Sequence, residues 1–210
     1  MKLDDRGLLV VISGPSGVGK GTVRSALFNM TGHDLVYSVS MTTRAPREGE
    51  VDGVDYYFVT REEFEQGIRE NKFLEYAEFV GNYYGTPLDK VEEQLALGKE
   101  VVLEIEVQGA LQVREKMKDA LFIFIAPPSI EDLYQRLINR GTEPIETINE
   151  RIAKAKREIK LAYLYDYIVV NDDVDNAADK ILAIIRATHA KTERTIHNYN
   201  KLMGVKDNGL

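Results

Sequence analysis

The hydrophobic positions of the chain form short apolar segments separated by longer amphipathic ones. The apolar segments are residues 8–12, 35–39, 101–105, 121–126 and 167–170. Such runs, rich in Val, Ile and Phe, are typical of strands that are covered on both faces of a sheet. Helical spacing occurs between most of them, at residues 22–30, 88–97, 108–117, 129–138, 148–163 and 176–189. This alternation predicts an α/β fold with a parallel five-stranded sheet and right-handed crossovers.

Residues 40–87 do not follow this alternation. Two strand-like segments, 56–59 and 73–80, flank a short helix whose start is indicated by Thr60 and Glu63, a capping-box pair. We therefore expect a small α+β insertion over residues 40–87, within one discontinuous core domain made of residues 1–39 and 88–197. The polar tail at residues 198–210 is expected to be frayed.

Composition narrows the class of protein. Hydrophobic residues make up 44% of the 210, which allows a full core. The net charge of −7 disfavours general nucleic-acid binding, and the absence of cysteine excludes disulfides and thiolate metal sites. The apolar runs are too short to span a membrane, and the N-terminus has no secretory pattern. We expect a cytoplasmic protein without nucleic-acid or membrane partners, either a monomer or a homodimer.

A glycine-rich loop that ends in lysine directly follows the first apolar segment. Glycines let successive N–H groups turn inward around an anion, and a helix starting near the lysine adds a positive dipole end. The lysine would reach the outer phosphates as a point charge. The pattern predicts a nucleotide-phosphate site, although a glycine-rich turn with an incidental lysine is the plain alternative. The residues concerned are Gly14, Pro15, Ser16, Gly17, Val18, Gly19, Lys20, Gly21 and Thr22.

Position 21 departs from the usual phosphate-loop motif. Gly21 stands where most such loops have Ser or Thr, whose hydroxyl helps to hold magnesium. Thr22 follows one position later and is a candidate for a phosphate contact. The glycine argues mildly against a signalling GTPase and is typical of small kinases.

A second anion site is indicated by two arginines that are three positions apart. Arg44 and Arg47 lie in a segment that also contains Pro46 and Gly49. Guanidinium groups bind phosphate in a bidentate manner, so a close pair could clamp a second phosphate. Taken alone, the pair would more often be a solvated basic turn.

Six sequence blocks, taken in order, resemble the guanylate kinase family, and the resemblance covers residues 8–188. It implies a three-layer P-loop fold in which the loop holds ATP and the insertion binds GMP. It also implies transfer of the γ-phosphoryl group from ATP to GMP, with Mg²⁺ accompanying ATP and residues 140–149 forming a lid. The blocks are residues 14–21, 38–50, 55–59, 73–75, 81–86 and the paired segments 140–143 and 170–173.

The resemblance implies roles for individual residues on the GMP side. Arg44, Arg47, Tyr56 and Tyr84 match the residues that clamp the GMP phosphate. The residues that match the guanine contacts are Ser40, Glu75 and Thr86. A carboxylate accepts both N1–H and N2–H₂ of guanine, whereas adenine would leave Glu75 poorly paired.

On the ATP side, basic residues match those that a lid closes over the nucleotide. They are Arg136, Arg140 and Arg151, which with Lys20 and Arg44 make the predicted catalytic set. Asn171 matches a residue near the adenine. No general base is required, because a GMP phosphate oxygen is already a nucleophile, and His33, His189 and His197 lie outside every block.

Two acids near the end of the 101–105 segment differ from the aspartates that many relatives have. Glu104 and Glu106 are expected on the same face of a strand, at its C-terminal end, where α/β sites lie. They could orient a magnesium water, Arg44 or guanine, so their individual roles stay open. No metal ligand is certain, and Glu104 acting through water is the candidate for Mg²⁺. An acidic strand end without a ligand is the alternative.

Three other functions fit the sequence less well. A catalytically inactive guanylate-kinase-like interaction module would be expected to have a degraded loop, but Gly19 and Lys20 are intact. A kinase for another nucleoside monophosphate is disfavoured by Glu75 together with Ser40 and Thr86. A GTPase is disfavoured because the chain has no N-K-x-D segment.

Overall fold

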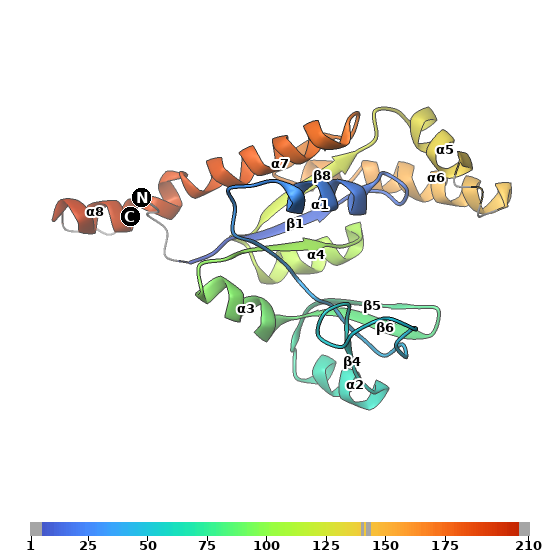
Figure 1. The fold of residues 1–210 in the computed structure, drawn as a ribbon, viewed down its shortest axis with the longest axis horizontal. Helices are drawn as coiled ribbons and strands as arrows, with labels where there is room; N and C mark the ends of the chain where they lie inside the picture. Colours follow the sequence, from blue (N-terminus) through green and yellow to red (C-terminus); the bar gives the residue numbers. More distant parts are fainter. Residues whose placement is uncertain (1–5, 140, 142–143, 206–210) are drawn as a thin grey trace.

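A computed structural model describes residues 6–139, 141 and 144–205, and its main sheet confirms the predicted five parallel strands. The order of the strands is β2-β7-β1-β8-β9 (Figure 1). In register, Val11 of β1 lies opposite Leu103 on one side and Phe122 on the other. The bounds are β1 (Leu9–Ser13), β2 (Leu35–Tyr37), β7 (Glu100–Glu104), β8 (Leu121–Ala126) and β9 (Tyr167–Val170).

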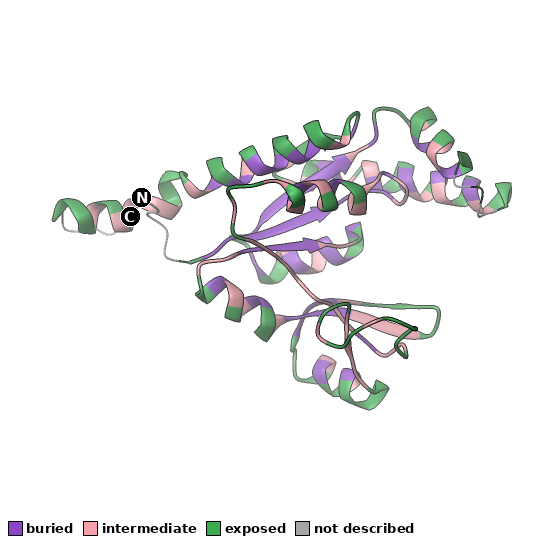
Figure 2. Ribbon diagram, viewed as in Figure 1, coloured by how far each residue is buried: buried purple, intermediate pink, exposed green. Residues whose placement is uncertain are grey.

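Helices cover both faces of this sheet and give the expected three layers. Because strand side chains alternate, Val10 and Ile12 pack against α1 (Lys20–Asn29) and α7 (Val174–His189). Leu9 and Val11 pack on the opposite side, with α3 (Leu88–Ala96) and α4 (Val107–Lys116). The buried residues accordingly follow the central strands (Figure 2).

At one end of the molecule, α5 (Ile130–Asn139) packs on α6 (Ile145–Ile159) through a small cluster that includes Leu133 and Ile152. A 3₁₀ turn, Ala162–Leu164, then leads to β9. The sequence pattern predicted one helix over residues 148–163, so both boundaries shift by a few residues. Pro144 explains the earlier start, because proline is favoured at the beginning of a helix and unfavourable within one.

A second, four-stranded sheet lies within the range predicted for the insertion. Its order is β4-β3-β6-β5, and helix α2 (Arg61–Arg69) packs on it. The Thr60–Glu63 capping box that the sequence predicted is present, with each side chain bonded to the other residue's backbone N–H. The strand bounds are β3 (Met41–Thr42), β4 (Tyr57–Phe58), β5 (Phe73–Phe79) and β6 (Asn82–Pro87).

Strand β5 connects the second sheet to the core. The side-chain amide of Gln112 on α4 accepts from the N–H of Tyr76 (3.2 Å) and donates to its carbonyl (3.1 Å). Lys116, one turn further along α4, donates to the carbonyl of Phe73 (2.7 Å), and Leu74 is buried in the core cluster. The insertion is therefore attached along one edge, while its β4 edge lies away from the core.

The expectation that the chain frays from Asn198 is wrong for residues 198–203, which belong to helix α8 (Thr192–Met203). Gly204 ends the helix in the left-handed conformation (φ 68°), a common helix stop. All residues of α8 are exposed or half-buried, so its polar composition reflects a solvated helix rather than a coil. None of the helices in the described parts of the chain is long and apolar enough to cross a membrane.

Candidate active site

The glycine-rich loop joins β1 to α1 at the carboxyl end of the main sheet. Gly17 and Gly19 have φ values of 89° and 95°, a region that other residues rarely adopt. A Cβ atom on Gly14 would lie 2.2 Å from the carbonyl oxygen of Ile125 on β8, so only glycine fits there. Gly21 differs, because it has ordinary helical geometry inside α1. The expectation that Gly21 adopts a backbone conformation open only to glycine is therefore wrong.

Lys20, the first residue of α1, turns its ammonium group back over the loop. Its Nζ donates to the carbonyl oxygens of Gly14 (2.7 Å) and Pro15 (3.3 Å). Burial lowers the pKa of Lys20, and the carboxylates of Glu106 and Glu104 oppose that shift. The charge therefore lies where an incoming phosphate could replace the carbonyls as its partner.

Two residues predicted from the sequence support the loop through its backbone. Asn171 is buried after β9, and its side-chain amide donates to the carbonyl of Val18 (2.8 Å). Arg136 of α5 donates to the same carbonyl (3.0 Å) and to that of Asn171 (2.8 Å). The guanidinium of Arg136 thus ties together the loop, α5 and the end of β9.

Arg151 of α6 donates to the hydroxyl of Ser16 (2.7 Å), so it also meets the loop. Arg140, predicted to act beside it, lies outside the described residues. A cavity of about 580 Å³ lies over the loop, and Arg151, Arg24 and Glu104 complete its wall. Sequence reasoning missed Arg24. Its spacing was the available signal, because it follows Lys20 by four positions on the same helix and so shares its face.

The expectation that Glu104 and Glu106 share one face of a strand is wrong. Strand β7 ends at Glu104, and Glu106 is the N-cap residue of α4. The Glu104 side chain is 18% exposed and lies 3.4 Å from Arg24, beside the loop cavity. The Glu106 side chain is 62% exposed and pairs with Lys154 of α6 at 2.7 Å. The two acids therefore have different surroundings.

The predicted clamp on the insertion centres on Arg44. Its guanidinium lies 5.4 Å from the ring centre of Tyr56, and the Tyr56 and Tyr84 rings are 6.0 Å apart. The guanidinium also binds the carboxylate of Glu50 at 2.8 Å, and this bond lowers the pKa of Glu50. Glu50 was not predicted from the sequence, although it lies next to the pair of arginines.

Arg47 is exposed, and its backbone N–H donates to the second oxygen of Glu50 (2.7 Å). Glu50 thus closes the turn that carries both arginines. Because Glu50 is an anion bound to one of these cations, the turn is shaped to receive negative charge.

Glu75 on β5 is the most deeply buried of the predicted acids. Its side chain accepts a hydrogen bond from the hydroxyl of Thr86 on β6 (2.7 Å), and burial raises its pKa. A Cβ atom on Gly109 of α4 would lie 2.8 Å from the second Glu75 oxygen, so the carboxylate packs directly against the core helix. Ser40, the other predicted guanine contact, is half-buried directly before β3, and its carbonyl accepts from the N–H of Tyr57 (2.9 Å).

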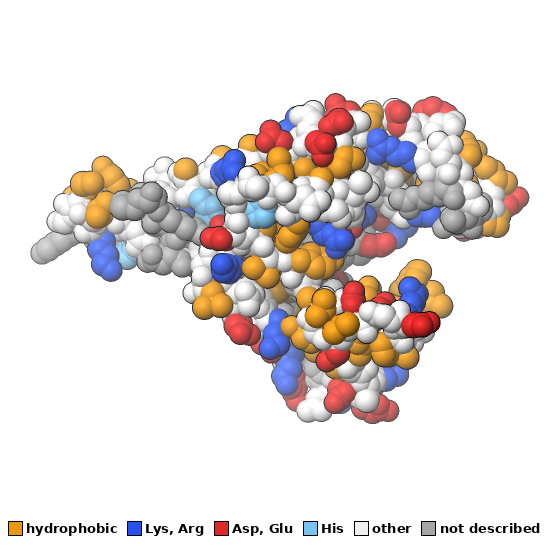
Figure 3. Space-filling model, viewed as in Figure 1, with side chains coloured by type: hydrophobic (Ala, Val, Ile, Leu, Met, Phe, Trp, Pro, Cys, Tyr) orange, Lys and Arg blue, Asp and Glu red, His pale blue; other side chains and the backbone are white. Residues whose placement is uncertain are grey.

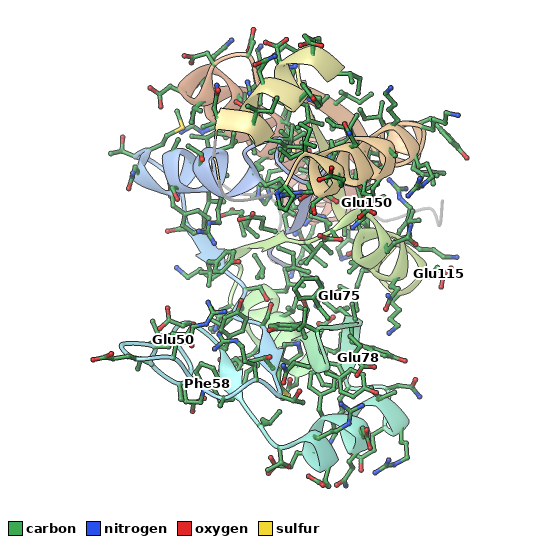
Figure 4. All side chains as sticks on the ribbon, turned by 90° about the vertical axis from the view of Figure 1, so that its right-hand side faces the viewer. Glu50, Phe58, Glu75, Glu78, Glu115 and Glu150 are labelled. Carbon is green, nitrogen blue, oxygen red and sulfur yellow. The ribbon has the colours of Figure 1, made fainter. Side chains whose placement is uncertain are left out.

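In the view of Figure 4, Glu75 lies where the insertion meets the core, while Glu50 and Phe58 lie further out on the insertion. The molecular surface is hollowed between the insertion and the part of the core that carries α5 and α6 (Figure 3). The arrangement offers one phosphate-binding loop on the core and one arginine clamp on the insertion. Chemically, it suits two phosphorylated substrates held on either side of this hollow.

Within the described ranges, no group of three or more His, Cys, Asp or Glu side chains could hold a metal ion. A magnesium ion here would take most of its ligands from substrate phosphates and water, as Mg²⁺ commonly does. Glu104 is the acid that borders the loop cavity and could add a further oxygen.

The comparisons with known proteins agree with this geometry. The family model described as guanylate kinase matches residues 6–188. The chain is 61% identical to the guanylate kinase of Aster yellows witches'-broom phytoplasma, covering 97% of each chain. It is 57% identical to that of Bacillus subtilis, covering 97% of this chain and 100% of the relative. The crystal structure of guanylate kinase from Anaplasma phagocytophilum superposes with a TM-score of 0.73 at 36% identity, covering 97% of this chain and 99% of the other.

Proposed function

Because this chain belongs to the guanylate kinase family, we propose that its loop binds ATP and its insertion binds GMP, and that the γ-phosphoryl group passes between them. A GMP phosphate oxygen forms the new P–O bond, the bond to the β-phosphate breaks, and ADP and GDP leave. The observation that carries the proposal is the pairing of an intact phosphate loop with the buried Glu75–Thr86 pair across one hollow.

On the donor side, Lys20 exchanges its two loop carbonyls for phosphate oxygens. Arg151 and Arg140 add positive charge as the 140–149 lid closes, while Arg136 holds the loop in shape. Phosphoryl transfer needs alignment and charge stabilisation more than covalent help, so these cations supply most of what the protein contributes. In this scheme Asn171 holds the Val18 carbonyl in place and lies near the adenine of ATP.

On the acceptor side, the GMP phosphate replaces Glu50 as the main partner of the Arg44 guanidinium. Arg47, Tyr56 and Tyr84 complete the clamp. Two guanidinium groups and two phenols suit a dianionic monophosphate, because each supplies hydrogen-bond donors to a phosphate oxygen.

Guanine recognition rests on Glu75, with Thr86 and Ser40 beside it. The carboxylate is already desolvated, and Thr86 fixes its rotamer. Guanine N1–H and N2–H₂ compensate the buried charge, whereas adenine presents an acceptor at N1 and leaves it unpaired. Buried polar groups that lose their partner are a strong basis for such discrimination.

Magnesium fits this site when it accompanies ATP. Glu104 would hold it through water, and the ion would neutralise part of the phosphate charge during transfer. A cytoplasmic location and a monomeric or homodimeric state stay predictions, as does closure of the insertion toward the core.

An ADP-release assay with GMP, AMP, CMP and UMP tests the function. We expect turnover with ATP, Mg²⁺ and GMP, and almost none with the other three monophosphates. Rates with AMP equal to those with GMP would contradict the Glu75 assignment and favour a kinase of another specificity. No turnover with any of the four would favour the non-catalytic interaction module.

A further inference from the structure

One face of α6 presents three charged side chains to the core. Arg151, Lys154 and Glu158 follow one another at helical spacing, so they lie on one stripe of the helix. Arg151 meets the phosphate loop through the hydroxyl of Ser16. Lys154 and Glu158 have no part in the proposed function, although the charges of both act on Lys20.

Lys154 bridges two carboxylates that come from different helices. Its ammonium lies 2.7 Å from Oε2 of Glu106, the N-cap residue of α4, and 3.6 Å from Oε1 of Glu158, one turn further along α6. The hydrogen bond to Glu106 raises the pKa of Lys154, so the bridging ammonium is charged at neutral pH. Lys154 is therefore a cation that the two acids share.

Glu158 is the acid that depends on this bridge. Its side chain is 6% exposed, and its Oε2 atom has no hydrogen-bond partner among the described residues. Burial raises the pKa of Glu158, and the charges of Lys154 and Lys20 oppose that shift while Glu106 adds to it. The Glu106 side chain is largely exposed, so water can solvate it without a cation. A buried carboxylate that loses its cation is far less stable, because no water takes the place of the partner.

Lys20 is the other cation whose charge acts on Glu158. The Lys20 ammonium nevertheless bonds to two loop carbonyls, and the cation paired with Glu158 in the described structure is Lys154. Without Lys154, the buried charge of Glu158 would be compensated by Lys20, and its carboxylate would compete with a nucleotide phosphate for that ammonium. The exposed Glu106 also acts on Lys20, but hydration screens its charge.

From these contacts we propose that Lys154 is a positioning residue for the donor site. By holding the buried carboxylate of Glu158, it leaves the Lys20 ammonium free to bind the phosphates of the donor nucleotide. The inference rests on the proposed binding of ATP at the loop, and it gives Lys154 no contact with the nucleotide.

Titration calorimetry with ADP, with Mg²⁺ present throughout, tests the positioning role. Lys154→Met keeps the aliphatic stem but removes the charge, and it is expected to weaken ADP binding about tenfold, the scale of one hydrogen bond to a charged group. Glu158→Gln in the same protein removes the competing charge and preserves its shape. It is expected to bring the affinity back to within about twofold of the unmutated protein, and Lys154→Arg, which keeps the charge, is expected to stay in the same range.

Further variants separate this competition from other effects. Lys154→Met combined with Glu106→Gln removes the exposed acid of the bridge instead, and it is expected to restore little of the affinity. Lys156→Met removes a cation from an exposed position of α6 and is expected to leave the ADP affinity unchanged. Because Lys154 is itself 44% exposed, its substitution leaves the core intact, and melting curves check that every variant is folded.

Two results would overturn the proposal. One is an ADP affinity in Lys154→Met within about twofold of the unmutated value. The other is a failure of Glu158→Gln to improve on Lys154→Met alone, because a merely structural loss is not cured by removing a second charge. Equal rescue by Glu106→Gln would contradict the role given to Glu158. A failure of the unmutated protein to bind ADP would instead contradict the proposed ATP site.

Discussion

The two phosphate-binding regions are stabilised in different ways. The donor loop is fixed by backbone contacts: Gly14 abuts Ile125, and the Val18 carbonyl receives two side-chain donors from the core. The acceptor clamp is carried by a small sheet, and its central cation, Arg44, is held by an ion pair with Glu50 near the surface. We infer that the donor side is rigid before ATP arrives, whereas the acceptor side exchanges partners when GMP binds.

The largest effect is expected from Lys20→Ala. Removing the only ammonium over the loop in the described structure should lower kcat by about 10³-fold or more, because it removes charge stabilisation from the transferring group. The fold should persist, since desolvation already disfavours the charged form of this buried lysine. Steady-state kinetics and a melting curve measure both effects. Lys90→Ala, on an exposed face of α3, is the control, and an equal loss there would contradict the assignment.

Glu75→Gln should lower the specificity for GMP and raise the stability of the ligand-free protein. Without the carboxylate, kcat/KM for GMP should fall about 10²-fold or more, because one guanine donor loses its acceptor. The ligand-free protein should nevertheless become more stable near neutral pH, since burial raises the pKa of Glu75 above the ordinary value of 4.5. Kinetics with GMP, together with melting curves of the ligand-free protein, measure the two effects.

The sign of the pH effect follows from the direction of that shift. With a raised pKa, stability from the protonated form is fully present below pH 4.5 and is lost as the pH rises through the folded-state value. Melting temperatures measured from pH 4 to pH 8 should therefore show a loss in the unmutated protein that is smaller in Glu75→Gln. Parallel curves would contradict the buried charge.

Asn171→Ala tests whether the donor site can be weakened without affecting the acceptor site. It removes a buried amide that supports Val18, so the KM for ATP should rise about tenfold while the KM for GMP changes little. The melting temperature should also fall, because a buried hydrogen bond contributes about 1 kcal/mol and its cavity remains. An equal change in both KM values would mean that the two sites are not separate.

The smallest effect is expected from Glu50→Gln. The glutamine keeps the shape of the turn but loses the charge that pairs with Arg44. Because the pair is half-buried near the surface and the glutamine oxygen can still accept a hydrogen bond from Arg44, the KM for GMP should change by less than about fivefold. Arg44→Ala, assayed alongside, should raise it far more. If Glu50→Gln raised the KM for GMP as much as Arg44→Ala, phosphate binding would depend on Glu50 itself. The proposed exchange of Glu50 for the GMP phosphate at Arg44 would then be contradicted.

The parts of the fold set by local patterns could be predicted from the sequence. Apolar runs gave the five parallel strands, and Thr60 with Glu63 gave the start of α2. Positions that depend on where a strand ends could not be predicted, because the 101–105 pattern continues beyond Glu104 while the sheet does not. That one boundary separates Glu104 from Glu106 and changes what each acid contacts.

Site residues that face a partner from another element were the hardest to anticipate. Arg24 and Gly109 contact predicted site residues only because distant segments meet in the fold, whereas Glu50 reaches Arg44 through the turn that joins them. Gly21 and Glu104 were each recognised as unusual, but their proximity requires α1 and β7 to lie side by side. The α8 helix was missed for another reason, since a helix without a single buried residue has the composition of a loop.

The attachment of β5 to α4 has a geometric consequence. Gln112 engages both peptide groups of Tyr76, so the edge of the insertion that carries Glu75 is the part least able to shift. Any rotation of the insertion then turns about α4, and Arg44, beyond β3 toward the opposite edge, travels through a wider arc. Under the proposed roles, the base would be recognised on the side of the sheet that stays in place, and the phosphate would be bound on the side that moves further.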